Sequence, residues 1–130
     1  MICLDSDFIV DFLRQKQNAV SRLQSLKGET VVSTEISYFE VLYGIFDKNP
    51  VPENEMNLVQ RFFDSITNIS LDHPSAYKAA EIAVYLDGTG QTIGLSDTLI
   101  GGICLAHNCT ILTKNLKHFS RIKGLKVETY

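Results

Sequence analysis

The chain opens on four apolar residues, Met1–Leu4, that run directly into a carboxylate, Asp5. A continuous apolar run without polar alternation favours a strand that helices cover on both faces, and such strands belong to parallel sheets. Ligands and catalytic groups of open α/β sheets gather at the carboxyl ends of the strands. The opening stretch therefore predicts that Asp5 lies at the functional edge of a sheet. The alternative is that Asp5 or Ser6 only caps the helix that follows.

Short apolar runs alternate with amphipathic helical patterns along the remainder of the chain. Further strands are predicted at residues 30–33, 69–71, 110–113 and 125–128, and helices around residues 8–13, 19–26, 35–46, 56–66, 74–86 and 97–107. Strands that alternate with helices indicate an α/β protein, a three-layer α/β/α fold with a mostly parallel central sheet of four to five strands. No repeat or long linker divides the sequence, so residues 1–130 are expected to form a single domain.

Hydropathy and cysteine usage favour a cytoplasmic protein. No apolar segment approaches the roughly 18–20 residues that a membrane span needs, and Met1–Leu4 is too short for a signal peptide. The three cysteines are an odd number and widely placed, which fits reduced thiols. A zinc site built from Cys104, His107 and Cys109 is the less favoured interpretation, because buried free cysteine is the ordinary case.

The net charge of -3 and the pI of about 5.5 argue against a protein that coats nucleic acid through bulk electrostatics. The charge is unevenly distributed, because the end of the chain holds five cations and Glu128 as its only acid. These cations are Lys114, Lys117, Arg121, Lys123 and Lys126. A basic strip beside an acidic centre could hold a phosphate backbone, and a solvated surface is the alternative.

Two further acids interrupt apolar stretches. Glu40 lies among nearly continuous apolar residues at 36–44, where an ionised carboxylate is costly unless it is paired or binds a cation. The alternatives are that Glu40 faces solvent or pairs with a lysine. Asp97 begins a predicted helix that contains Gly101 and Gly102, and two glycines inside a helix indicate the close approach of another backbone. The helix dipole alone would also favour an acid at position 97.

Asn115 follows the strand predicted at 110–113 in the way that Asp5 follows the first strand. Residues just past neighbouring parallel strands point into the same crevice. Asp5, Glu40, Asp97 and Asn115 are therefore expected to form a cluster of oxygen ligands. Oxygen-only sites suit Mg²⁺ or Mn²⁺. The reaction that such a site suggests is metal-assisted phosphodiester hydrolysis.

Four segments, taken in their order and spacing, resemble the PIN-domain ribonucleases of the VapC toxin type. They are Leu4–Asp7, Phe39–Gly44, Ile93–Ile100 and Ile111–Phe119, the last leading to Ile122–Leu125. The resemblance implies a PIN-like fold and a metal-dependent endoribonuclease in which Mg²⁺, or Mn²⁺, activates water. It also implies a homodimer and a type II toxin–antitoxin pair, in which a segment of the antitoxin occupies the acidic groove.

Within this resemblance, Asp5, Glu40 and Asp97 match the three metal-binding acids of the family. Asn115 stands where many members have a fourth acid, and its neutral side chain weakens the case for a tightly held second ion. The residues expected to support the site are Ser6, Asp7 and Thr113. The cations expected to contact the RNA backbone are Lys114, Lys117 and Arg121.

Two other functions compete with this one. Asp5-Ser6-Asp7 also resembles the start of haloacid-dehalogenase-type phosphatases, in which the first Asp is a covalent nucleophile. That interpretation leaves Glu40 unexplained. The other candidate is a catalytically weak PIN-like module for RNA binding or dimerisation, which the neutral Asn115 favours.

Overall fold

The computed structural model describes residues 1–130, which form a five-stranded sheet and seven helices. The strands are β1 (Ile2–Leu4), β2 (Val31–Thr34), β3 (Thr67–Ile69), β4 (Thr110–Leu112) and β5 (Lys126–Glu128). The helices are α1 (Ser6–Leu13), α2 (Gln17–Ser25), α3 (Glu35–Phe46), α4 (Glu53–Asp64), α5 (His73–Gly88), α6 (Leu95–Ala106) and α7 (Leu116–Phe119). Neighbouring strands all pair in parallel, in the order β3-β2-β1-β4-β5. The predicted α/β fold with a parallel sheet is confirmed.

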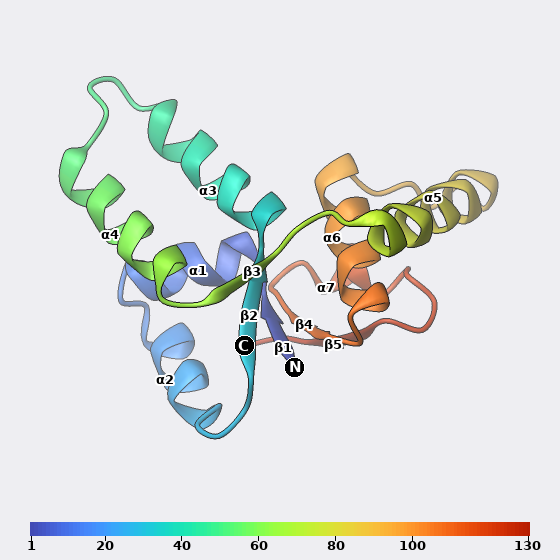
Figure 1. Cartoon of the computed structure of the whole chain (residues 1–130), viewed down its shortest axis with the longest axis horizontal. Coiled ribbons are helices and arrows are strands. Elements are labelled where there is room, and N and C mark those ends of the chain that lie inside the picture. Colours follow the sequence, from blue (N-terminus) through green and yellow to red (C-terminus); the bar gives the residue numbers. More distant parts are fainter.

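Helices cover both faces of the sheet, with α1–α4 on one side and α5–α7 on the other (Figure 1). Successive residues of β1 alternate between two hydrophobic cores. Ile2 and Leu4 pack with α1–α4, whereas Cys3 packs with α5–α7. Burial on both faces is therefore the reason why the opening run is continuously apolar. No helix combines the length and the apolar character that crossing a bilayer requires.

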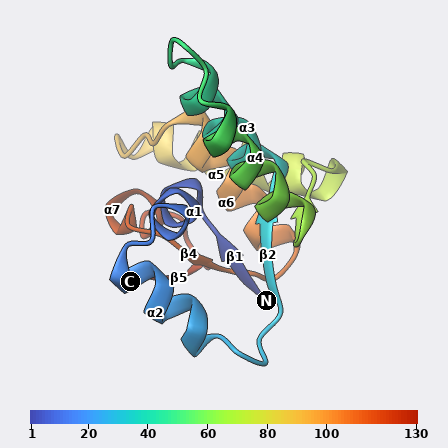
Figure 2. The same cartoon turned by 90° about the vertical axis from the view of Figure 1, so that its left-hand side faces the viewer.

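The carboxyl ends of β1 and β2 lead directly into helices at one edge of the sheet (Figure 2). Asp5 is the N-cap of α1, and its side chain accepts a hydrogen bond from the Ser6 backbone N–H at 2.8 Å. Thr34 caps α3 in the same manner, accepting from the Ser37 N–H at 2.9 Å. Because β4 pairs with β1, Thr113 reaches the same edge as Asp5.

Small residues hold α6 tightly against α5. A Cβ atom added to Gly102 would lie 2.6 Å from the Ser75 carbonyl oxygen and 2.7 Å from the Ala79 Cβ. No side chain fits at this position, so the predicted close approach of another backbone is confirmed. The contact fixes the orientation of α6, whose first turn carries Asp97.

Several element boundaries differ by one to three residues from those predicted from the sequence. β3 covers Thr67–Ile69 rather than 69–71, because its pairing with β2 ends at Ile69. α6 begins at Leu95 rather than at residue 97, because Gly94, with an extended backbone (φ -62°, ψ 158°), is its N-cap. Asp97 lies in the first turn of α6 with either start.

Candidate active site

Asp5 lies at the carboxyl end of β1 and is almost fully buried, with 4% of its surface exposed. Its Oδ1 accepts from the Ser6 backbone N–H at 2.8 Å, and its Oδ2 accepts from the Thr113 hydroxyl at 2.7 Å. Burial raises the pKa of Asp5 to about 7, and the charge of Asp7 adds to the shift, although both hydrogen bonds oppose it. An ionised Asp5 is therefore poorly compensated by its surroundings, and a nearby cation would stabilise it.

Asp7 lies in the first turn of α1, beside the turn that follows β4. Its Oδ2 accepts from the backbone N–H of Lys114 at 3.1 Å. Its Oδ1 is buried and has no hydrogen-bond partner. Burial also raises the pKa of Asp7. Buried polar atoms are rarely left unpaired, so this oxygen is the clearest local sign that the site accepts a cation or a donor.

Glu40 reaches the same edge from α3 and is half-buried. Its Oε1 accepts from the Ser6 hydroxyl at 3.2 Å, so Ser6 links Glu40 to Asp5. Burial raises the pKa of Glu40, and the charges of Asp97 and Asp7 raise it further. Glu40 makes no ion pair with a lysine. The structure therefore does not support the pairing of Glu40 with a lysine. It agrees with a partly buried carboxylate that lies close to other carboxylates, where a cation could bind.

Asp97 is held by two donors from the turn after β4 and from α7. The Asn115 Nδ2 donates to the Asp97 Oδ2 at 2.8 Å, and the His118 Nδ1 lies 2.8 Å from the same oxygen. Asn115 is itself fixed, because its backbone N–H donates to the Thr113 hydroxyl oxygen at 2.9 Å. Both side-chain donors use Oδ2, which leaves the Asp97 Oδ1 available. His118 was not singled out from the sequence, although its spacing from Asn115 places both at the start of one short helix.

The acids of this edge are near one another but do not form a ready-made metal cage. No three His, Cys, Asp or Glu side chains are grouped so as to hold a metal ion directly. Protein donors hold Asp5, Glu40 and Asp97 separately, and like-charged carboxylates repel one another. Mg²⁺ usually keeps several waters and needs only one or two direct carboxylates. Hard oxygen donors, together with the unpaired Asp7 Oδ1, therefore fit a hydrated Mg²⁺ or Mn²⁺ ion.

Asp11, buried on α1, anchors the turn after β4 and the last residue of the chain. Its carboxylate forms ion pairs with Lys16, at 3.0 Å, and with Lys114. It also accepts a hydrogen bond from the Tyr130 hydroxyl at 2.9 Å. Burial alone would raise the pKa of Asp11, but these three donors outweigh it and lower the pKa to about 2. The Tyr130 ring also packs edge-on against Phe8, at 4.7 Å between centroids. Lys114 thus fixes the turn to α1.

The other two cations predicted to contact RNA lie beyond this turn. Lys117 is exposed on α7. The Arg121 Nη1 donates to the carbonyl oxygens of Gln91 at 3.3 Å and of Thr92 at 3.1 Å, which leaves its other donors available. Lys117 lies next in sequence to His118, whose ring contacts Asp97.

The cysteines and His107 form no second site. All three cysteines are free and buried. The His107 Nε2 lies 2.7 Å from the Asp72 Oδ2 at the N-terminus of α5. Buried thiols and a histidine paired with a carboxylate agree with the favoured interpretation of these residues.

Comparison with known proteins places this geometry in a family. A family model described as the PIN domain matches residues 2–125. The tRNA(fMet)-specific endonuclease VapC of Salmonella typhimurium is 24% identical over 127 residues, covering 98% of this chain and 96% of that protein. Ribonuclease VapC2 of Rickettsia felis is 28% identical over 104 residues, covering 80% of this chain and 77% of that protein. A crystal structure of VapBC2 from Rickettsia felis, bound to a DNA fragment from their promoter, superposes with a TM-score of 0.91 at 26% identity, covering 100% of this chain and 99% of that chain.

The fold and the site define an open parallel α/β domain with an acidic group at the carboxyl edge of its sheet. The chain belongs to the PIN-domain family. It is similar over nearly its whole length to VapC proteins, so the resemblance indicated by the sequence is confirmed. Nucleases of the VapC type in this family generally depend on divalent metal ions.

Proposed function

We propose that the chain is a Mg²⁺- or Mn²⁺-dependent endoribonuclease, formed by a single domain over residues 1–130, and that it acts in the cytoplasm as the toxin of a VapBC-type pair. The observation that carries the proposal is the acidic group at one edge of the sheet. Burial, together with repulsion from neighbouring carboxylates, raises the pKa values of Asp5, Asp7 and Glu40, and a bound cation would stabilise their ionised forms. The names of the relatives from Salmonella typhimurium and Rickettsia felis support ribonuclease chemistry.

Asp5, Glu40 and Asp97 would hold the metal ion. When bound, the ion lowers the pKa of a coordinated water and offsets charge on the scissile phosphate. Ser6 holds two of these acids at once, because its N–H donates to Asp5 and its hydroxyl donates to Glu40. Thr113 fixes the second oxygen of Asp5. The acids are thus positioned before substrate binds, which reduces reorganisation during the reaction.

The RNA backbone would lie along α7. Lys117 is exposed, and Arg121 keeps free donors, so both can bind phosphate oxygens. Lys114 is already paired with Asp11, and its attraction for phosphate is correspondingly reduced. Exposed contacts of this kind contribute about 1 kcal/mol or less each.

Incubation of the purified chain with RNA tests the proposal directly. RNA fragments are expected with Mg²⁺ or Mn²⁺ and not with EDTA. Asp97→Asn should lower the cleavage rate by roughly a hundredfold or more, because it removes a charge from the metal site. Asp64→Asn, at an exposed position at the end of α4, is the matched control and should leave the rate unchanged. Intact RNA in the presence of calorimetrically bound metal would instead favour the RNA-binding module.

The phosphatase alternative requires a phosphoryl group covalently attached to Asp5. Both Asp5 oxygens accept hydrogen bonds from the protein, and the matching family is the PIN domain, so hydrolysis by an activated water is favoured. Trapping of an aspartyl-phosphate on Asp5 would reverse this preference.

A groove beside Glu40 offers a place for the antitoxin. The groove has a volume of about 270 Å³ and lies between α1, α3 and α4. Its apolar lining residues are Val10, Leu13, Val41, Ile45, Leu58 and Val59. Exposed apolar surface commonly marks a protein partner, and the VapBC2 complex from Rickettsia felis supports an antitoxin. Loss of co-purification with a co-expressed antitoxin in Leu58→Asp tests the groove. Sedimentation velocity tests the expected homodimer.

His118→Ala is expected to weaken Mn²⁺ binding by about tenfold, because the Asp97 Oδ2 loses one of its two donors and Asp97 becomes less well oriented. Calorimetric titration with Mn²⁺ measures the change without relying on activity. Lys117→Ala, which alters the neighbouring exposed residue of α7, should bind Mn²⁺ as wild type does. Equal affinities for His118→Ala and wild type would exclude a positioning role for His118.

A further inference from the structure

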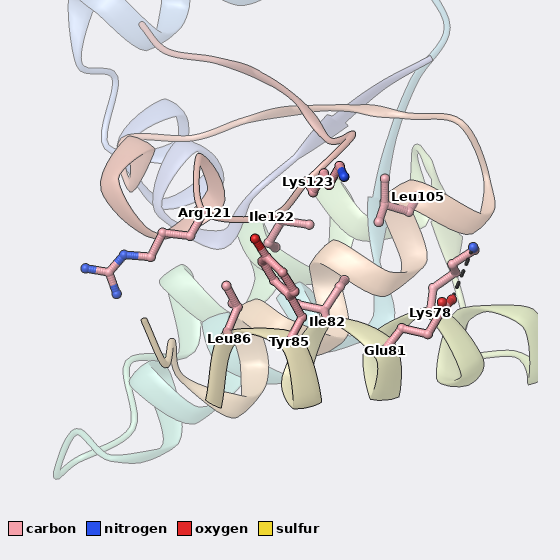
Figure 3. Close-up of a pocket in the computed structure, with 9 residues that line it drawn as sticks. All are labelled: Lys78, Glu81, Ile82, Tyr85, Leu86, Leu105, Arg121, Ile122 and Lys123. Carbon is pink, nitrogen blue, oxygen red and sulfur yellow. Dashed lines mark hydrogen bonds and ion pairs between the residues drawn. The ribbon is translucent and has the colours of Figure 1, made fainter. Parts of the chain in front are cut away.

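A second hollow lies on the other side of the molecule from the Glu40 groove, between α5, the end of α6 and the segment that follows α7 (Figure 3). Its volume is about 260 Å³. The floor is apolar and consists of Ile82, Leu86, Leu105 and Ile122. The Tyr85 ring rises from α5 toward Ile122 and is 55% exposed. None of these residues takes part in the acidic site.

The rim of this hollow is cationic, although the chain as a whole has a net charge of -3. The lining includes three cations, Lys78, Arg121 and Lys123, and a single carboxylate, Glu81, which pairs with Lys78 at 3.2 Å. Lys123 makes no ion pair. The local charge therefore complements a polyanion.

The hollow and the acidic site share one connecting segment. His118 of α7 contacts Asp97, and Arg121, one helical turn further on, lines the hollow. Arg121 also binds the carbonyl oxygens of Gln91 and Thr92, in the loop that leads into α6. A strand of RNA placed over the acidic site and continuing along α7 would therefore reach the hollow.

We propose that this hollow is a nucleotide subsite, in which one base of the RNA stacks on Tyr85 above the apolar floor while Lys123 binds its phosphate. The inference rests on the proposed endoribonuclease function and extends it to a flanking nucleotide. The hollow is smaller than the roughly 300 Å³ of typical pockets for free ligands. A base brought in by a strand that is already held at the acidic site avoids much of the entropic cost of binding.

A protein occupant fits these observations less well. Lysine is depleted from protein–protein interfaces relative to the rest of the surface, whereas two lysines, Lys78 and Lys123, line this hollow. Aromatic rings set among cations are instead the pattern by which proteins bind single-stranded nucleic acid. A second copy of the chain is retained as an outcome of the test.

Binding of a fluorescein-labelled single-stranded RNA, measured in an Asp97→Asn background to prevent cleavage, tests the subsite. Tyr85→Ala should raise the Kd by about tenfold, the loss expected for one stacked base, and Tyr85→Phe should retain the wild-type Kd. Tyr77→Ala alters another exposed tyrosine of α5, outside the hollow, and should have no effect. Lys123→Ala should raise the Kd by about threefold at low salt and less at high salt.

An abasic RNA of the same length separates stacking from phosphate binding. With this RNA the effect of Tyr85→Ala should disappear, while that of Lys123→Ala should persist. An unchanged Kd in Tyr85→Ala overturns the subsite, and an unchanged Kd with loss of a dimer in sedimentation assigns the hollow to a second copy. RNA that is bound in a Tyr85-dependent manner but never cleaved by wild type supports the subsite and refutes the proposed nuclease. Normal cleavage with an unchanged KM in Tyr85→Ala supports the proposed nuclease and refutes the subsite.

Discussion

Asp5→Asn is expected to abolish metal-dependent RNA cleavage and, in the same protein, to stabilise the metal-free fold at pH 8. The wild-type carboxylate is 4% exposed and lies near Asp7 and Glu40, so its ionisation in the folded state is unfavourable. The amide of Asn can still accept from the Ser6 N–H and carries no charge. Asp5 is thus expected to be essential for cleavage and, without metal, to make the folded state less stable than Asn would.

The gain in stability should depend on pH with a definite sign. The pKa of Asp5 is about 7 in the folded chain, above its usual value of 3.8, so the folded state binds the proton more tightly. The contribution of Asp5 to wild-type stability is therefore fully present below about pH 4 and is lost as the pH rises to about 7. The free energy of unfolding of Asp5→Asn relative to wild type should grow by about 2–4 kcal/mol between pH 4 and pH 8.

Urea unfolding in EDTA at pH 4 and pH 8 measures this difference. Asp64→Asn removes one exposed charge on α4 and should show little pH-dependent gain. Normal RNA cleavage by Asp5→Asn would show that Asp5 is not part of the active site. A variant that is inactive but less stable at pH 8 would show that its hydrogen bonds, rather than its charge, dominate its energetics.

The opening strand and its acid could be predicted because their signal is local. Four consecutive apolar residues require burial on both faces, and the structure divides Ile2, Cys3 and Leu4 between two cores. The sequence allowed Asp5 to be a helix cap or a residue at the carboxyl edge of the sheet, and the structure places it in both positions. One side chain caps α1 and also lies where β1 and β4 end. Its role as a metal ligand stays a prediction.

The contacts that hold the site could not be predicted, because they join residues distant in sequence. Asp11 pairs with Lys114 and with Tyr130, and neither partner lies near it along the chain. From sequence, Lys114 is indistinguishable from the other cations near the end of the chain. His118 was missed for a similar reason, since its partner Asp97 belongs to another helix. Hydrophobic periodicity predicts where helices and strands lie in the sequence. Contacts between polar side chains depend instead on how those helices and strands pack in three dimensions.

Asp11→Ala is expected to lower the free energy of unfolding by about 2–3 kcal/mol, because three donors lose a shared buried acceptor. The loss stays below that for a fully buried ion pair, since the side chains of Lys16 and Lys114 are 50% and 44% exposed and can be hydrated. The pKa of Asp11, about 2 in the folded chain, lies below its usual value of 3.8. The stability that it contributes is therefore present above about pH 4 and is lost as the pH falls toward 2.

The same substitution should also weaken the metal site. Lys114 stands between Thr113, which binds Asp5, and Asn115, which binds Asp97. Once its ammonium is released from Asp11, this turn loses its ion pair with the middle of α1 and keeps only its contacts with Asp5 and Asp7 at the start of that helix. Calorimetry with Mn²⁺ and urea unfolding of Asp11→Ala measure the two effects together.

Lys16→Ala is the matched control, because it removes the exposed partner of Asp11 and leaves the turn after β4 in place. It should change stability by less than about 1 kcal/mol and should leave Mn²⁺ affinity unchanged. If Asp11→Ala lost stability but kept wild-type Mn²⁺ affinity, the anchor would serve the fold alone. A parallel loss of both would mean that the buried carboxylate on α1, which contacts no substrate, sets the geometry of the acids across the sheet edge.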